Sequence, residues 1–401
     1  MKILLILEAT LGGTSRHILD LASGLLERGT EVHLIYSTRR ADQGFRGGLL
    51  ALANSFEHFR CKELPMTRAV TLSDFACYLN LTRYIGEEGP FDIIHAHSTK
   101  AGFLARLLVN TQSARMIYTS HGLMTMNPEL TGFRRRAVCT LESALARRTD
   151  TVIAVSEDER RCAVATGIVP TKLIVIANGI QFVSASVQSK QRKAIRSSIG
   201  LDSDAVLIGC VGRFARQKRP DRMLEAYALL RQRTPRTSRL LMVGWGALEE
   251  HLRRQVARLN LEDHVLFLGQ ADAANYMPAF DVLAHTARFE AFAYVFVEAL
   301  AAGVPVVTTR VGAADELISD GITGYVCDPW NPEIFADYLQ LLVDDPERRR
   351  AMSGAARQRA AHYSVDRMVD STVELYRQVG GGSGSSTQVP ACYQTFTGAR
   401  R

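Results

Sequence analysis

Residues 290–307 read EAFAYVFVEALAAGVPVV, and the order of residue types in this stretch decides the fold. Residues 294–302 are aromatic, apolar and helix-forming residues, Gly303 can end a helix, and residues 304–307 form a short run rich in valine. A helix followed by a glycine turn and a strand is part of a βαβ unit. The stretch therefore predicts a parallel sheet with helices packed against it.

The same alternation continues in both directions along the chain. Short runs rich in Val and Ile alternate with longer amphipathic segments, which is typical of repeated βαβ units. Strands are expected at residues 2–7, 32–36, 61–64, 92–97, 116–120, 151–155, 173–176, 205–210, 240–243, 265–268, 282–285, 304–308 and 324–326. Helices are expected at residues 16–26 and 133–146 and from near residues 221, 248, 295 and 332.

The length of the chain favours two domains of this kind. Domains commonly have roughly 100 to 200 residues, and the chain has 401. Between residues 184 and 198 the periodic pattern is replaced by Ser, Gln, Lys and Arg, so the boundary is placed there. The fold class is therefore α/β, with two Rossmann-like domains. The expected divisions are an N-terminal domain at 1–185, a C-terminal domain at 186–360, a helix in 361–379 that packs back on the N-terminal domain, and a disordered tail at 380–401 that begins GGGSGSS.

Composition excludes several classes of protein. A hydrophobic content of 47% with 22% charged residues is ordinary for a globular chain. The first apolar run ends at Glu8, and no run is long enough for a membrane span, so a cytoplasmic location is expected. The seven cysteines show no C-x-x-C spacing, which disfavours a disulfide framework or a zinc site. The net charge is +7, but the basic residues are not interleaved with aromatic residues, so no nucleic-acid partner is expected.

Glycines and cations follow several strands at the edge where parallel sheets bind ligands. Gly12 and Gly13 lie between the first strand and a helix, where backbone amides can approach a phosphate. Arg213 and Lys218 flank the equivalent turn in the second domain and can hold a diphosphate without a metal. Gly244 adds a further glycine turn on the same edge.

Two carboxylates bracket the loop that leads into the helix of the opening stretch. Glu290 lies in the loop, followed by Ala291, Phe292 and Ala293, and Glu298 lies about one turn inside the helix. The carboxylates can accept hydrogen bonds from ribose and sugar hydroxyls, while the helix start stabilises a phosphate between them. The residue types therefore suit a sugar nucleotide.

Residues 290–307, with Glu290 and Glu298 eight positions apart, resemble the E-x7-E signature of the retaining glycosyltransferases of family 4. Other segments resemble the family pattern in the same order, and the resemblance covers roughly residues 1 to 375. These segments are Gly12-Gly13, GTEV at 29–32, DIIHAH at 92–97, SHG at 120–122, VS at 155–156, IANG at 176–179, VGR at 211–213, Lys218 and GITG at 321–324.

The resemblance implies the GT-B architecture, two Rossmann-like domains facing across a cleft, with the donor mainly on the C-terminal domain and the acceptor on the N-terminal one. It implies transfer with retention, without metal or cofactor, in which the departing phosphate helps to deprotonate the acceptor. It also implies the residue roles. Arg213 and Lys218 hold the diphosphate, Glu298 the ribose and Glu290 the donor sugar, while Gly12 and Gly13 approach the phosphates and His121 lies beside the transferred sugar.

The chain departs from the family pattern at two places on the donor side. Ala291 and Ala293 stand where the family commonly has glycine, and alanine reaches positive φ less easily. His285 and Thr286 stand where Pro-Ser is frequent. These departures leave the identity of the donor sugar undecided, although a UDP-sugar is expected.

Histidines and a lysine near the expected acceptor side have different expected roles. His95, inside a strand, is expected to be structural, whereas His97 at the strand end and the nearby Lys100 are expected near the acceptor or sugar. His121, at the next strand end, is expected to be catalytic together with Glu290.

The segment HSTKAGFLAR at 97–106 is similar to bacterial glycosyltransferases that build exopolysaccharide, capsule or lipopolysaccharide units. A glycan or lipid-linked acceptor follows, and the basic segment 134–148 is then expected to dock on an anionic membrane surface through charge. Two alternatives remain open. A GT-B sugar-nucleotide epimerase or hydrolase would consume donor without acceptor, and a non-catalytic glycosyltransferase-like binding protein would lack donor binding.

Overall fold

The computed structural model describes residues 1–69, 71–108, 114–202 and 204–380. Two compact units form this part of the chain. Unit 1 contains Met1–Gly179 and the helix that begins at Val365, and unit 2 contains Ile180–Ser364. The division therefore lies at Gly179 and not at residue 185. Apart from Gly380, which ends a helix, the tail expected to be disordered lies outside the described residues.

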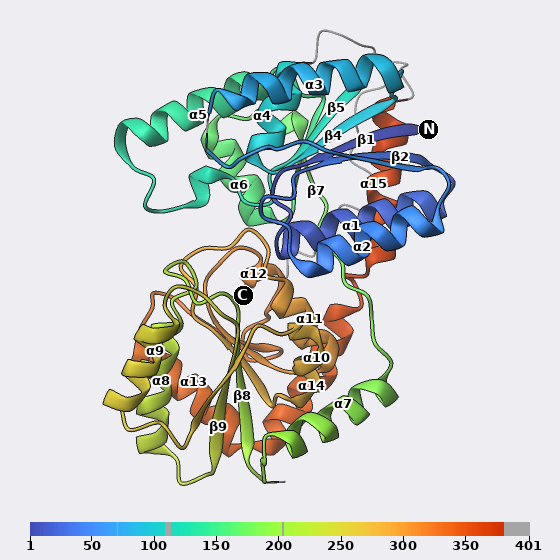
Figure 1. The fold of residues 1–401 in the computed structure, drawn as a ribbon. Helices are drawn as coiled ribbons and strands as arrows, with labels where there is room; N and C mark the ends of the chain where they lie inside the picture. The colour runs from blue at the N-terminus through green and yellow to red at the C-terminus, as the bar shows by residue number, and fades with distance from the viewer. Residues whose placement is uncertain (70, 109–113, 203, 381–401) are drawn as a thin grey trace. The chain divides into compact units, whose positions relative to one another are not determined.

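Unit 1 is built on a parallel seven-stranded sheet. Its strand order is β3-β2-β1-β4-β5-β6-β7 (Figure 1). Strands β2 and β3 are therefore added on one side of β1, and strands β4 to β7 on the other side. The strands are β1 (Lys2–Leu7), β2 (Glu31–Tyr36), β3 (Phe59–Glu63), β4 (Ile93–His97), β5 (Arg115–Thr119), β6 (Thr151–Ala154) and β7 (Leu173–Val175). The helices are α1 (Gly13–Glu27), α2 (Gln43–Ser55), α3 (Ser73–Glu88), α4 (Thr99–Leu107), α5 (Gly132–Ala146), α6 (Glu157–Thr166) and α15 (Val365–Gly380).

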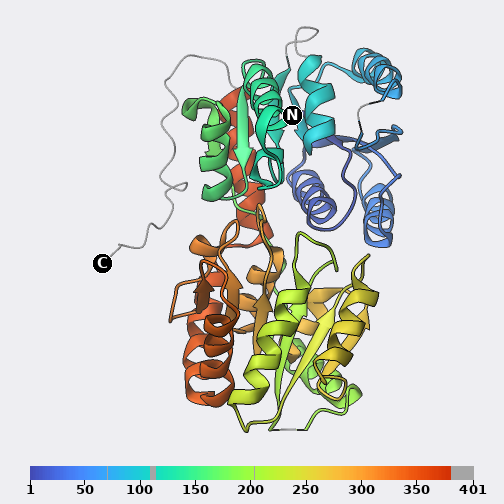
Figure 2. The same cartoon turned by 90° about the vertical axis from the view of Figure 1, so that its left-hand side faces the viewer.

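Side chains of β1 alternate between two hydrophobic cores, as a strand buried on both faces requires. Leu4 and Ile6 pack with residues of α3 and α4, whereas Ile3 and Leu5 pack with residues of α1, α2 and α15. Figures 1 and 2 show α15, in red, among the blue and green elements of unit 1. The last described helix thus completes the core of unit 1.

Unit 2 repeats the design with a parallel six-stranded sheet of order β10-β9-β8-β11-β12-β13. Helices cover both faces, with α8, α9 and α13 on one and α10, α11 and α14 on the other (Figure 1). The strands are β8 (Val206–Val211), β9 (Ser238–Val243), β10 (Val265–Gly269), β11 (Val282–His285), β12 (Val306–Thr309) and β13 (Gly324–Cys327). The helices are α7 (Ala185–Ser198), α8 (Pro220–Arg233), α9 (Glu249–Arg258), α10 (Ala273–Tyr276), α11 (Tyr294–Ala302), α12 (Ala314–Leu317), α13 (Pro332–Asp344) and α14 (Pro346–Ala360).

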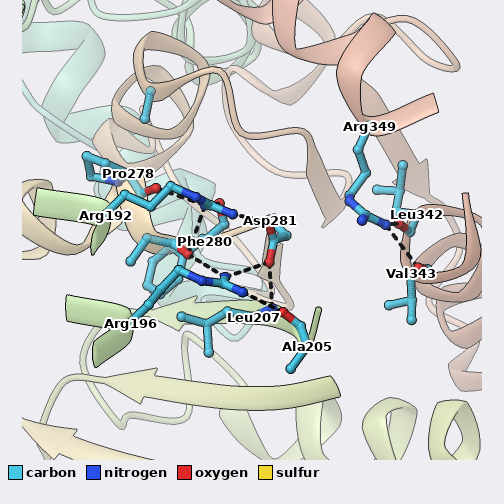
Figure 3. A network of polar contacts seen from close by, with 12 residues as sticks. Arg192, Arg196, Ala205, Leu207, Pro278, Phe280, Asp281, Leu342, Val343 and Arg349 are labelled. Carbon is cyan, nitrogen blue, oxygen red and sulfur yellow. Dashed lines mark hydrogen bonds and ion pairs between the residues drawn. The ribbon is translucent and has the colours of Figure 1, made fainter. Parts of the chain in front are cut away.

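Residues 184–198, where the periodic sequence pattern is lost, do not form a linker. They contain helix α7, and two arginines of this helix bind other residues of unit 2 (Figure 3). Nη2 of Arg192 lies 2.6 Å from one Asp281 oxygen and Nη1 of Arg196 lies 2.9 Å from the other. Burial raises the pKa of Asp281. The charges of Arg192 and Arg196, together with the hydrogen bonds that Asp281 accepts, outweigh this effect and hold the pKa below its usual value. Arg192 also donates to the carbonyl oxygens of Pro278, Ala279 and Phe280.

Both sheets place a topological switch point beside their first strand. In unit 1, β1 lies between β2 and β4, and in unit 2, β8 lies between β9 and β11. Open parallel sheets bind ligands outside the carboxyl ends of the strands at this point, because the loops diverge there. The loops that carry the predicted site residues follow β1, β4 and β5 in unit 1 and β8, β9 and β11 in unit 2.

Candidate functional site

Glycines allow the loops after β8 and β9 in unit 2 to pack backbone against backbone. Gly244 has a φ of 151°, and a Cβ there would lie 1.9 Å from the Gly212 carbonyl oxygen. A Cβ on Gly246 would lie 2.5 Å from the carbonyl oxygen of Phe214, whose amide donates to Trp245 at 2.8 Å. Gly244 is therefore required by sterics and fixes the floor of the candidate donor site.

Lys218 and Glu290, predicted separately for a phosphate and a sugar, form an ion pair in unit 2. Both side chains are largely buried, and Nε2 of His285 lies 3.9 Å from the same Glu290 oxygen. Burial, and then the charge of Lys218, holds the pKa of His285 well below its usual value. The imidazole is therefore neutral at pH 7, and the local charge is one cation balanced by one carboxylate.

The loop that carries Glu290 is tied to the loop that carries Lys218. The Arg288 amide donates to the Gln217 carbonyl oxygen at 2.8 Å, and the Gln217 side chain donates to the Phe289 carbonyl oxygen at 3.0 Å. The Thr286 hydroxyl donates to the Arg219 carbonyl oxygen at 2.8 Å. Thr286, one of the departures from the family pattern, thus helps to join the two loops.

The two alanines of the donor loop fit without backbone strain. Ala293 is extended, with φ −88° and ψ 97°, and caps helix α11. Within the described chain, the non-glycine residues with positive φ are Ser98, His121, Arg219 and Asn260, so neither Ala291 nor Ala293 needs a glycine backbone. Crowding comes instead from the loop after β12, because a Cβ on Gly312 would lie 2.6 Å from the Glu290 carbonyl oxygen.

Helix α11 begins at Tyr294, as expected, and carries Glu298 inside its first turns. The Glu298 side chain is buried, with 9% of the residue exposed, and Phe292 and Ala293 are buried beside the helix start. Arg213, in contrast, is exposed in the loop after β8. Unit 2 therefore brings together Lys218, Glu290 and the loop before α11 and leaves the Arg213 side chain accessible.

The predicted glycines of unit 1 lie at the start of α1. Gly12 caps the helix with a φ of 65°, and its amide donates to Asp42 Oδ2 at 3.1 Å. Gly12 and Gly13 are both exposed. A Cβ on Gly12 would have nothing within 4 Å, so the positive φ alone favours glycine there.

His121 follows β5 in a strained turn that a buried carboxylate holds in place. The backbone of His121 has a φ of 52°, which is uncommon for a residue with a side chain. Glu159 of α6 accepts hydrogen bonds from the amides of Gly122 at 2.7 Å and Leu123 at 3.1 Å, and from the Ser120 hydroxyl. Glu159 was missed in the sequence, although Ser156 and Glu159 have capping-box spacing.

His121 is one of four histidines gathered in unit 1. Its Nε2 lies 3.0 Å from His97 Nδ1, and its ring packs edge-on against His17 with 4.5 Å between centroids. The His95 ring is tilted against that of His97, with 3.9 Å between centroids, and is hydrogen-bonded to Tyr376 and Thr119, as suits a structural residue. Burial lowers the pKa of His17 to about 4 and holds the pKa of the other three well below the usual value. His17 was not singled out in the sequence.

Lys100, expected near the acceptor, has an internal partner instead. Its ammonium group lies 2.5 Å from Asp74 Oδ2 and 2.7 Å from the Ala69 carbonyl oxygen, and the residue is 6% exposed. A buried lysine paired in this way holds α4 against α3. This contact argues for a structural role and against direct contact with an acceptor.

Two Rossmann-like sheets with loop sites at their switch points define the fold, the GT-B fold of solved glycosyltransferases. Sequence comparison agrees. Residues 11–182 match the family model described as Glycosyltransferase Family 4, and residues 191–359 match the model described as Glycosyl transferases group 1. The chain belongs to glycosyltransferase family 4 and is a transferase enzyme.

Several sequence relatives are D-inositol 3-phosphate glycosyltransferases. The D-inositol 3-phosphate glycosyltransferase of Saccharomonospora viridis is 27% identical over 390 residues, covering 92% of this chain and 89% of the relative. That of Kineococcus radiotolerans is 28% identical over 404 residues, covering 92% and 90%.

Solved structures show the same fold. Anabaena HepE in complex with UDP and glucose has a TM-score of 0.78 at 23% identity, covering 94% of this chain and 100% of that chain. WaaG, a glycosyltransferase involved in lipopolysaccharide biosynthesis, has a TM-score of 0.71 at 19% identity, covering 95% and 100%. Among the described helices, none combines the length and apolar character needed to cross a membrane.

Proposed function

We propose that the chain transfers a hexose from a UDP-sugar, with retention, to a glycan or lipid-linked acceptor of bacterial surface polysaccharide synthesis. The contact of Lys218 with Glu290, beside the start of α11, is the observation that carries the donor half. A structural relative, HepE, has been solved with UDP and with UDP-glucose, which favours uridine among the nucleotides.

The donor chemistry follows from the residues of unit 2. Lys218 and the exposed Arg213 supply two cations for a diphosphate, and Glu298 lies inside α11 for the ribose hydroxyls. When the diphosphate engages Lys218, the Glu290 carboxylate becomes available to accept hydrogen bonds from the sugar. Lys218 and Arg213 compensate the charge of the departing diphosphate, so the proposed reaction needs no metal and no cofactor.

For unit 1 we propose a role in acceptor binding and turnover. His121, held in a fixed turn by Glu159, has a neutral imidazole that can accept or donate one hydrogen bond. Gly12 and Gly13 are exposed at the start of α1, where an anionic group can accept from the Gly13 amide and can replace Asp42 Oδ2 as the acceptor of the Gly12 amide.

A lipid-linked acceptor also agrees with the surface of α5, which supports peripheral docking on the inner face of the cytoplasmic membrane. Arg134, Arg136, Arg147 and Arg148 are all exposed on or next to this helix. Phe133 beside them is 84% exposed, so an apolar contact accompanies the charge. Charge alone was expected from the sequence.

The names of the sequence relatives support a second acceptor class, a phosphorylated cyclitol such as inositol 3-phosphate. The likeness to those enzymes extends over 92% of the chain. Both acceptor classes use the same proposed donor site, so they differ only in what unit 1 binds.

The test offers UDP-, GDP- and ADP-sugars with each acceptor class and follows release of nucleotide and the glycosylated product. Thermal shift ranks the donors first, since a ligand at 100 times its dissociation constant stabilises by about 2.7 kcal/mol. We expect UDP-sugars to bind and product to form with a lipid-linked acceptor. Product with inositol 3-phosphate alone would favour the second class. Donor consumption without any acceptor would indicate an epimerase or hydrolase, and the absence of donor binding would overturn the proposal.

A further inference from the structure

Three histidines in unit 1 offer ring nitrogens to a common point. His17 comes from α1, His97 from the end of β4 and His121 from the turn after β5. One ring nitrogen of each lies within 4.8 Å of the other two, and the nearest pair, His97 Nδ1 and His121 Nε2, is separated by 3.0 Å. Three elements far apart in sequence thus converge on one small volume.

The spacing fits a metal ion held by imidazoles. Zinc–nitrogen bonds of about 2.0–2.1 Å in a tetrahedron place two ligand nitrogens about 3.4 Å apart. The closest pair is within a few tenths of an ångström of that separation, and the third nitrogen can reach it by side-chain rotation. Three histidines with a fourth position open are a known zinc arrangement.

A neighbouring residue orients the first of these ligands. Asn178 Oδ1 lies 2.9 Å from His17 Nδ1 and accepts a hydrogen bond from its N–H, so the lone pair of His17 is on Nε2. A hydrogen bond of this kind to the second nitrogen is the usual support of a metal-bound histidine. Asn178 is itself buried, with 3% exposure, so the support is rigid.

The nitrogens of His97 and His121 that face each other are fully buried on the His97 side and are joined by a single hydrogen bond. Buried polar atoms are nearly always paired with protein, water or an ion. The close nitrogens of His97 and His121 can share only one proton between them, so a cation that accepts both lone pairs suits the pair better.

We infer that His17, His97 and His121 form a binding site for one divalent transition-metal ion, with Zn²⁺ the best suited. The donors are all imidazole nitrogens, which favour zinc and disfavour magnesium and calcium, whose ligands are oxygens. The ion is not needed by the proposed transfer and would occupy His121.

The test measures metal binding directly. The full chain is stripped with a chelator and titrated with Co²⁺, whose visible absorption is intense only in tetrahedral sites, and Zn²⁺ is then added in competition. We expect one equivalent of tetrahedral Co²⁺ per chain, displaced by Zn²⁺ and unaffected by excess Mg²⁺. A weak octahedral spectrum at every ratio would overturn the inference.

Variants assign the site to these residues. His17→Gln and His121→Gln should each abolish the tetrahedral absorption, and Asn178→Ala should weaken Zn²⁺ binding about 10- to 100-fold. His58→Gln, at an exposed histidine of the same unit, is the matched control and should bind as the parent does. Far-ultraviolet circular dichroism of each metal-free variant checks folding. If His17→Gln unfolds, His121→Gln decides, because His121 is only partly buried; unchanged absorption in that variant would exclude the site.

Discussion

The ion pair of Lys218 and Glu290 joins two residues that the sequence assigned to different ligands. Lys218 and Glu290 lie far apart in sequence, and their types suggested a phosphate ligand and a sugar ligand. The structure pairs them, so a cationic and an anionic side chain lie in contact in a largely buried place. Removing Lys218 would leave a buried carboxylate without its cation, which makes Lys218→Ala a poor probe of donor binding.

Glu298 and His121 are cleaner probes, because their proposed roles separate binding from turnover. We expect Glu298→Ala to raise the dissociation constant for UDP about 10- to 100-fold, since a hydrogen bond to a charged group contributes roughly 1.5–3 kcal/mol. His121→Ala should lower kcat and leave UDP affinity within about twofold. Calorimetric UDP titration and steady-state kinetics measure the two effects, and exchanged phenotypes would contradict the assigned roles.

Gly244 tests the steric argument for the floor of the donor site. Gly244→Ala should destabilise unit 2 by about 3 kcal/mol and weaken UDP binding, because the new methyl would meet the Gly212 carbonyl oxygen. Gly269→Ala is the matched control. Gly269 also has a positive φ, but a Cβ there has nothing within 4 Å, so we expect a loss of only about 1 kcal/mol. Urea unfolding measures both, and equal losses would refute the contact.

At the scale of elements, the fold was largely predictable and the site only in part. Strand runs such as 2–7 and 206–211 are apolar on both faces, so their periodicity signals a buried parallel strand. Helix α7 was missed because it has no buried residue and is held by arginines instead of an apolar face. His17 and Glu159 were missed because their roles depend on partners in other elements.

The link from α6 to the His121 turn gives a prediction for an element that touches no substrate. Glu159→Gln replaces one accepting oxygen by a donor, so it cannot accept from Ser120, Gly122, Leu123 and Val155 together. We expect kcat to fall about tenfold or more, with UDP affinity retained. Glu157→Gln, on the same helix and paired with Arg160, should change kcat little. Equal kcat values for the two variants would exclude a role of Glu159 in positioning His121.

At the scale of the molecule, the charged surface of α5 leads to a prediction about vesicles. Arg134→Gln with Arg136→Gln should weaken binding to vesicles containing anionic lipid about 30-fold, because each cation near such a surface contributes about 1 kcal/mol. Binding by the parent should also weaken with salt. Phe133→Ser should weaken binding equally at low and high salt, because its contact is apolar.

Vesicle flotation measures this, with Arg253→Gln and Arg254→Gln as the control on the exposed surface of α9 in unit 2. Those two arginines pair with glutamates one turn away and lie outside the basic segment. Binding that survives neutralisation of Arg134 and Arg136, or that falls equally in the control, would contradict docking through α5.

The buried histidines of unit 1 make the stability of the whole chain depend on pH. Burial lowers the pKa of His17 from 6.5 to about 4, so between these values the unfolded chain binds a proton that the folded chain does not. Stability is therefore complete above about pH 6.5 and falls as the pH drops toward 4. His17 alone accounts for about 3 kcal/mol, and His95, His97 and His121 act in the same direction. Urea unfolding from pH 7.5 to pH 4.5 should show this loss. His17→Gln, which carries no titrating group, should have a shallower dependence, and His58→Gln should match the parent. An equally steep dependence in His17→Gln would mean that this imidazole is not buried in its neutral form.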